Sequence, residues 1–218
     1  MLEERIVELK KEVTMFAAHN KEMLSRAIDG LVNRKDENLN KIINEDESLA
    51  NEKELNIDHL CTTLIAQYQP NATNLRIILM ASKINNDLER MADHVCNIAQ
   101  SAKLLITQPP VKPLVDIPNM TEIAIGMQQD AINAFVKDDT ELARDILARD
   151  KQVNNLRDQV LRELITYMTD HSSTIERSLH LIRIASNLER IADLATNIAE
   201  DIVFIVDGLV IKHPGVNK

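Results

Sequence analysis

Apolar residues recur every three or four positions along most of the chain. Between Ile84 and Leu105 these positions alternate steps of four and three, which is typical of the buried face of a long helix in a bundle. They are Ile84, Leu88, Met91, Val95, Ile98, Ala102 and Leu105. The same spacing returns at Ile184, Leu188, Ile191, Ala195, Ile198, Ile202 and Ile205. We therefore predict two long helices, each with one face in a hydrophobic core.

Helical spacing also covers most of the remaining chain, and turn-forming residues divide it. Gln69, Pro70 and Asn71 stop the second predicted helix, and Thr73 or Asn74 caps the third, which contains residues 84–105. The other five predicted helices span residues 2–33, 36–68, 120–136, 139–169 and 172–206. Three such helices joined by short turns form an up-down-up bundle.

The second half of the sequence repeats the first. NRKDENLNKIINEDESLAN, from residue 33, aligns with VKDDTELARDILARDKQVN, from residue 136, and the two long helices share Leu-Glu-Arg-x-Ala-Asp followed by Asn-Ile-Ala. Such self-similarity indicates an internal duplication. We therefore predict an all-α fold of two tandem, sequence-related three-helix bundles, at residues 1–106 and 119–207. A Pro-rich linker at 107–118 joins them, and a tail at 208–218 follows.

Composition supports this fold and limits the partners. The chain has 4 Gly, 6 Pro, no Trp and 2% aromatic residues, which favours helix over sheet. Its formal net charge of −9 argues against nucleic-acid binding and favours cations or basic protein surfaces. Cys61 and Cys96 fit small buried residues in a reducing compartment, and neither a signal peptide nor an apolar run long enough for a membrane span is evident. We expect a cytoplasmic protein.

Polar residues with oxygen ligands form a ladder beside each apolar face. Residues four apart stack on one side of a helix, and the ladders are Glu89, Asp93 and Asn97, repeated as Glu189, Asp193 and Asn197. The preceding predicted helices offer Glu47, Asn51 and Glu54 in the first repeat, and Asp150 and Asn154 in the second. Such oxygens suit Mg²⁺, Mn²⁺, Fe or Zn²⁺. The spacing alone leaves two alternatives open: metal sites or solvated acidic stripes.

Other candidate chemistry is sparse. We expect Arg90 and Arg190, which follow the ladder acids, to form salt bridges with carboxylates of a neighbouring helix. No Glu-x-x-His occurs, which argues against a carboxylate-bridged oxidase built like the ferritin-type bundles. No P-loop, dinucleotide fingerprint, serine elbow or zinc signature is found either.

The doubled motif resembles the signature of the PhoU family of phosphate-specific transport system accessory proteins. The resemblance rests on LERMADH at 88–94 with NIA at 97–99, and on LERIAD at 188–193 with NIA at 197–199. It implies two three-helix bundles and multinuclear metal clusters on Glu89/Asp93 and Glu189/Asp193. The partner positions on the preceding helices fall on Glu47/Asn51 and Asp150/Asn154. Arg157 stands where the first repeat has Glu54, which implies a weaker second cluster.

The same resemblance implies a regulator rather than an enzyme. Its expected partners are an ABC-type phosphate transporter and a membrane sensor histidine kinase, with attachment to the inner membrane only through them. It would act as a homodimer and keep phosphate-starvation genes off while phosphate is plentiful. Three alternatives remain: a PhoU-like chaperone of a different phosphate transporter, a carboxylate-bridged metalloenzyme, and a metal-free helical adaptor.

Overall fold

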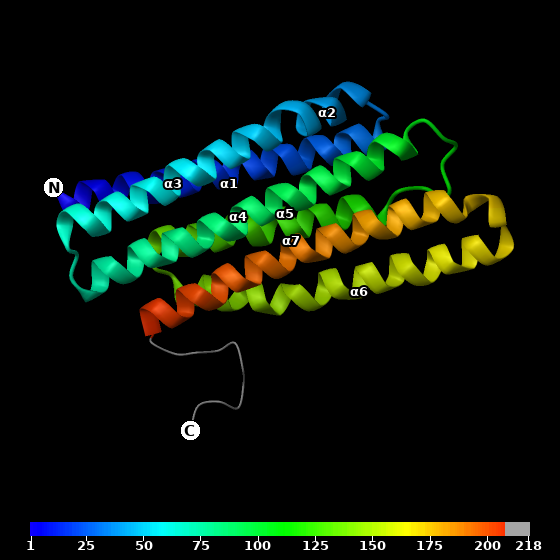
Figure 1. Cartoon of the computed structure of the whole chain (residues 1–218). Coiled ribbons are helices and arrows are strands. Elements are labelled where there is room, and N and C mark those ends of the chain that lie inside the picture. Colours follow the sequence, from blue (N-terminus) through cyan, green and yellow to red (C-terminus); the bar gives the residue numbers. More distant parts are fainter. Residues whose placement is uncertain (208–218) are drawn as a thin grey trace.

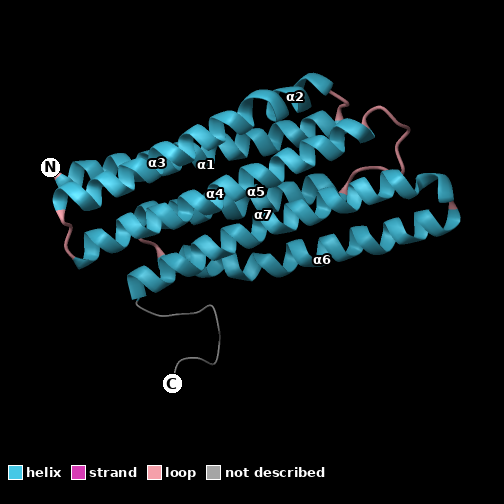
Figure 2. Cartoon of the chain, viewed as in Figure 1, coloured by secondary structure: helices cyan, strands magenta, loops and turns pink. Residues whose placement is uncertain are grey.

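Helices make up nearly all of the structure, a computed structural model that describes residues 1–207 (Figure 2). No strand occurs in that range, so the all-α prediction is confirmed. The predicted tail at 208–218 lies outside the described residues. The elements are α1 (Leu2–Val32), α2 (Asp36–Lys41), η1 (Ile42–Asp46), α3 (Glu47–Tyr68), α4 (Ala72–Leu105), α5 (Asp116–Lys137), α6 (Thr140–Asp170), η2 (Ser172–Thr174) and α7 (Ile175–Asp207).

The helices form two three-helix bundles that lie side by side (Figure 1). In the first, α4 packs against α1 and α3; in the second, α7 packs against α5 and α6. The two bundles meet where α4 packs against α7 and α1 against α5. Two tandem bundles were predicted, and this is confirmed. Their broad lateral contact was not predicted, and it leaves α3 and α6 on opposite outer sides.

The predicted apolar faces form the core. From Ile84 to Ala102 every predicted position of α4 is buried, and so is every one from Ile184 to Ile202 in α7. Leu105 is only partly buried, and the side chain of Ile205 is outside the described part of the chain. Buried residues of both bundles belong to one continuous hydrophobic cluster. The bundles therefore share a core.

Buried amides fix how neighbouring helices sit against one another. Gln128 of α5 donates its side-chain Nε2 to the backbone oxygen of Ala17 in α1 over 3.1 Å, across the two bundles. Within the first bundle, Asn20 Nδ2 donates to the backbone oxygen of Leu88 over 2.6 Å. A buried amide that lost its partner would remain desolvated, so each bond penalises a sliding of the helices.

The structure corrects several predicted boundaries. Asn71, not Thr73 or Asn74, caps α4: its side-chain oxygen accepts from the backbone N–H of Asn74 at 3.0 Å. The predicted second helix is interrupted by the π-helical turn η1. The linker ends at Val115 because α5 already begins at Asp116. Pro118 is tolerated there, since the first turn of a helix needs no hydrogen bond from its backbone nitrogen.

Candidate functional site

The first acidic ladder lies along the edge of α4 that faces α3. Glu89 is half-buried and Asp93 is exposed, while Asn97 Nδ2 donates to the backbone oxygen of Asp93 over 2.9 Å. Burial, followed by the negative charges of Asp93 and Glu54, raises the pKa of Glu89 above its ordinary value. Glu54 of α3 therefore joins the two ladder acids in one negative field.

Glu47 reaches the same region from the start of α3. Burial raises the pKa of the Cys96 thiol to about 12, with further contributions from Glu47, Asp93 and Asp46. Asp46 was missed by the sequence analysis because it belongs to the π-helical turn and breaks the spacing of four. It is buried, forms an ion pair with Arg26, and its backbone oxygen is 3.1 Å from His19 Nε2. The predicted Asn51 is exposed.

In the second ladder the pKa shift falls on Asp193. Burial, followed by the negative charges of Glu189 and Asp150, raises the pKa of Asp193 to about 6. Asn154 Nδ2 donates to Asp150 Oδ2 over 2.8 Å. The other side-chain oxygens of these two residues, Asp150 Oδ1 and Asn154 Oδ1, are buried and have no hydrogen-bond partner within residues 1–207. The predicted Asn197 is half-buried on the same helix.

Repelling carboxylates and buried oxygens that lack a donor are features that a bound cation would satisfy. The donor set of carboxylate and amide oxygens fits Mg²⁺, Mn²⁺ or Fe better than it fits a soft metal that prefers thiolate ligands. Within residues 1–207, however, no three His, Cys, Asp or Glu side chains are grouped closely enough to hold a metal ion. The structure brings most of the predicted ligands to one pair of helices in each bundle, α3 with α4 and α6 with α7, without arranging a coordination sphere. We call these two acidic surfaces the first and second grooves. Metal binding stays a prediction.

The two grooves differ in one charge. Arg157 of α6 occupies the position that Glu54 has in the first repeat, and its Nη2 lies 3.5 Å from Glu189 Oε1. The second groove therefore holds a cation supplied by the chain itself. A guanidinium beside Glu189 neutralises part of the charge that would attract a metal, which is a physical reason to expect weaker cation binding here than in the first groove.

Arg90 and Arg190 do not behave as predicted. Arg90 Nη1 is 3.4 Å from Asp87 Oδ1, a residue of its own helix, and Arg190 forms no ion pair within residues 1–207. Both instead line a polar cavity of about 310 Å³ between α4 and α7. The remaining lining residues are His94, Asp193, Leu194, Thr196 and Asn197. The prediction failed because the helix spacing does not reveal which helix of the other bundle faces an arginine.

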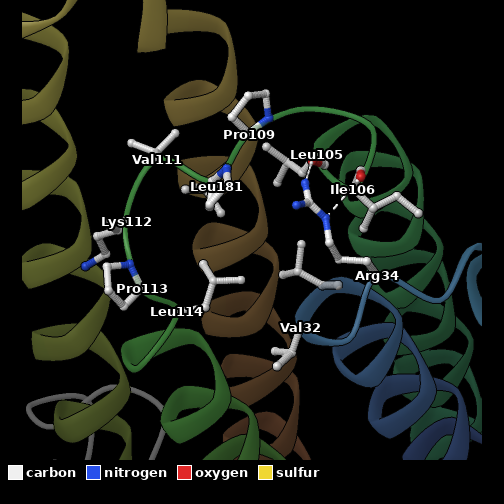
Figure 3. A pocket seen from close by; sticks show the side chains of 12 residues that line it. Val32, Arg34, Leu105, Ile106, Pro109, Val111, Lys112, Pro113, Leu114 and Leu181 are labelled. Atoms are coloured by element: carbon white, nitrogen blue, oxygen red, sulfur yellow. Dashed lines mark hydrogen bonds between the residues drawn. The ribbon is translucent and has the colours of Figure 1, made fainter.

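A second cavity of about 260 Å³ lies under the linker and is mainly apolar (Figure 3). Arg34 closes one side, where its Nε donates to the backbone oxygen of Ile106 over 3.1 Å. Lys112 anchors the linker on the other side through Asp116, over 2.7 Å, and through Glu163. None of the predicted site residues lines this cavity.

Among the helices of residues 1–207, none combines the length and the apolar character that a membrane span requires.

Comparison with known proteins places both bundles in one family. The model of the PhoU domain matches twice, at residues 13–102 and 117–202. A protein of Aquifex aeolicus named phosphate-specific transport system accessory protein PhoU homolog is 36% identical over 97% of this chain and 95% of its own length. The phosphate-specific transport system accessory protein PhoU of Escherichia coli is 32% identical over 95% of this chain and 86% of its own.

Solved structures show the same architecture. The crystal structure of PhoU from Pseudomonas aeruginosa superposes with a TM-score of 0.91 at 29% identity and covers 96% of this chain and 100% of its own. The phosphate transport system regulatory protein PhoU from Streptococcus pneumoniae gives a TM-score of 0.89 at 25% identity over 98% of this chain. Two matched domains, full-length relatives and a shared fold agree with the doubled motif, and the chain belongs to the PhoU family.

Proposed function

We propose that this protein is an accessory regulator of a phosphate-specific transport system. The observation that carries the proposal is the double match to the PhoU domain, which takes in both bundles and both acidic ladders. The printed names of its relatives agree: one is a transport system accessory protein, and another is a regulatory protein of a phosphate transport system. The role is a regulatory one, and no catalysis is assigned to the chain.

The partners that we propose are an ABC phosphate transporter of the Pst type and a membrane sensor histidine kinase of the PhoR type. Long helices provide extended faces on which two different proteins can dock, and α3 and α6 lie on opposite outer sides of the molecule. A formal net charge of −9 favours basic partner surfaces. The proposed location is the cytoplasm, at the inner membrane through these partners, and the proposed assembly is a homodimer.

We further propose that the ladders bind metal ions, Fe, Zn, Mn or Mg. In the first bundle Glu47, Glu54, Glu89 and Asp93 would hold the ion, and in the second Asp150, Asn154, Glu189 and Asp193. A bound cation supplies charge neutralisation here. It would relieve the repulsion that raises the pKa of Glu89 and Asp193, and would tie α3 to α4 and α6 to α7.

Deletion of the gene tests the regulatory role. We expect phosphate-starvation genes to be expressed in the deletion strain even in high phosphate, because the restraint on the sensor kinase is lost. A transcriptional reporter for that response measures the effect, with the intact gene supplied on a plasmid as the control. A reporter that stays silent, combined with reduced phosphate uptake, would contradict the signalling role and assign the protein to the chaperone alternative.

A further inference from the structure

The polar cavity between α4 and α7 lies at the contact of the two bundles, and two arginines, one from each bundle, line it. We propose that it binds a small phosphate-type oxyanion between Arg90 and Arg190. This inference goes beyond the proposed function: it concerns a ligand rather than a partner protein, and it is tested without a transporter or a kinase.

The two arginines face each other because of the duplication. Three contacts show that α4 and α7 run antiparallel: Asn97 with Arg183 at 3.1 Å, His94 with Asn187 at 2.9 Å, and Lys83 with Asp201 at 3.6 Å. As the residue number falls along α4, that of its partner rises along α7. Equivalent residues of the two repeats differ by 100 in this region, so the antiparallel pair crosses at the equivalent residues Arg90 and Arg190.

Two like charges on facing helices repel, and an anion between them offsets that repulsion by attracting both. Asp87 neutralises part of the charge of Arg90 at 3.4 Å. Arg190 forms no ion pair within the described chain, and the opposing charge of Asp193 interacts with it electrostatically from the same helix. Both side chains border a polar cavity of about 310 Å³, which is large enough for a tetrahedral oxyanion together with water. A planar guanidinium can donate two parallel hydrogen bonds to two oxygens of such an ion. Two guanidinium groups on opposite sides can therefore bind it through up to four hydrogen bonds.

The other lining residues add hydrogen-bonding groups. Asn187 Nδ2 donates to the backbone oxygen of Arg183 over 2.7 Å, so its Oδ1 is the acceptor for His94 Nδ1–H at 2.9 Å. The imidazole of His94 is thereby held in place at the cavity. Thr196 donates its hydroxyl to the backbone oxygen of Asp193 over 2.7 Å. These bonds order the wall of the cavity before any ligand enters, which lowers the entropic cost of binding.

Asp193 gives the cavity a basis for selecting its ligand. It lines the cavity together with the two arginines, and its carboxyl group offers oxygens that accept hydrogen bonds. Monohydrogen and dihydrogen phosphate carry a proton that they can donate to it, whereas sulfate at neutral pH carries none. An acceptor left unpaired against sulfate disfavours that ion. The expected preference is therefore phosphate over sulfate.

Calorimetric titration of the full chain tests the proposal, with inorganic phosphate, sulfate and phosphoserine as probes at constant ionic strength. Each titration is done on protein as purified and again after chelation. We expect phosphate to bind in both preparations and to bind more tightly than sulfate. Tighter binding of phosphoserine than of phosphate would identify a phosphorylated side chain as the source of the same phosphoryl group, and the reverse order would identify the free ion.

Variants connect the binding to the arginines. Arg190→Ala should weaken phosphate binding at least about tenfold, and Arg190→Lys should weaken it less, because the charge stays while the fork is lost. Arg76→Ala, an exposed arginine of the same helix as Arg90, is the matched control and should bind like the parent. Circular dichroism melting confirms that each variant is folded.

Three results would overturn the proposal. One is no heat of binding for any probe at concentrations up to about 10 mM. Another is equal affinity in Arg190→Ala and Arg76→Ala. The third is binding that disappears on chelation, since the anion would then be held by a metal in the acidic groove and not by the arginines.

Discussion

Asp193 shows how much the charge on one residue depends on its neighbours. Burial, then Glu189 and Asp150, raises its pKa in the folded protein to about 6, above the ordinary value of 3.8. Between these two values the folded state holds a proton that the unfolded state has released. Stability contributed by this residue is therefore present at pH 4 and is lost as the pH rises through 6. Because Asp193 is partly exposed, solvent screening keeps the effect small.

Replacing this carboxylate gives a prediction with a definite sign. In metal-free protein, Asp193→Asn should raise the free energy of unfolding at pH 7 and leave it nearly unchanged at pH 4, where the parent is already protonated. Urea denaturation followed by circular dichroism at both pH values measures this. Asp170→Asn, which changes an exposed residue at the end of the same bundle's α6, is the control. An equal gain at pH 4 and pH 7 would refute the electrostatic explanation.

Metal binding by the first ladder can be tested by removing two of its carboxylates. Glu89→Ala combined with Asp93→Ala should lower the metal content of the protein without unfolding it, because these side chains lie beside the core rather than in it. Elemental analysis after purification without chelator gives the metal content. Glu141→Ala with Asp145→Ala is the matched control, since it removes two exposed carboxylates four residues apart on α6. Equal metal in both double variants would mean that the ladder is a solvated face.

At the scale of the helix, the repeats differ where α3 corresponds to α6. Glu54 of α3 adds to the negative field around Glu89, whereas Arg157 of α6 pairs with Glu189 at 3.5 Å. Each helix presents the corresponding position to the ladder of its own bundle. The difference in charge therefore makes the electrostatic potential of the two grooves unequal.

Exchanging this one residue should make the grooves alike. Arg157→Glu restores the charge of the first repeat, so we expect more metal bound per chain than in the parent. In metal-free protein the same change should lower the free energy of unfolding, because a carboxylate replaces a guanidinium beside Glu189. Metal titration and urea denaturation measure the two effects. Arg162→Glu, at an exposed position of α6, should change neither appreciably.

The helices and their buried faces could be predicted because they depend on the spacing of apolar residues within one segment of the sequence. Leu88 and Leu188 are fully buried, as the alternation of four and three requires. The surroundings of Arg190 were not predictable in this way, because they depend on α4 packing against a helix about 100 residues later. Asp46 was missed for a different reason: the π-helical turn shifts the phase of the helix, and the spacing rule fails across it.

The whole molecule shares one hydrophobic cluster, so the bundles should not unfold independently. Leu188→Ala removes a fully buried side chain from the second bundle and should cost about 2–5 kcal/mol. Both cysteines of the chain, Cys61 and Cys96, are buried in the first bundle, and their thiols have pKa values raised to about 12, chiefly by burial. Their reaction with a thiol reagent therefore reports opening of the first bundle.

If the core is cooperative, Leu188→Ala should speed the reaction of these two thiols although it lies in the other bundle. The reaction is followed by absorbance under native conditions. Glu189→Ala, at the adjacent position of the same helix, should have much less effect, because its partner Arg157 is itself partly exposed. Unchanged thiol reactivity in a destabilised Leu188→Ala protein would mean that the second bundle opens alone.

The place where α4 crosses α7 also fixes how many copies of each site one chain can carry. Each acidic groove lies within one bundle and occurs once in each repeat, so substitution can alter one without the other, as at Glu54 and Arg157. The cavity at the crossing takes one arginine from each repeat and therefore exists once. An oxyanion that enters this cavity should accordingly saturate at one per chain.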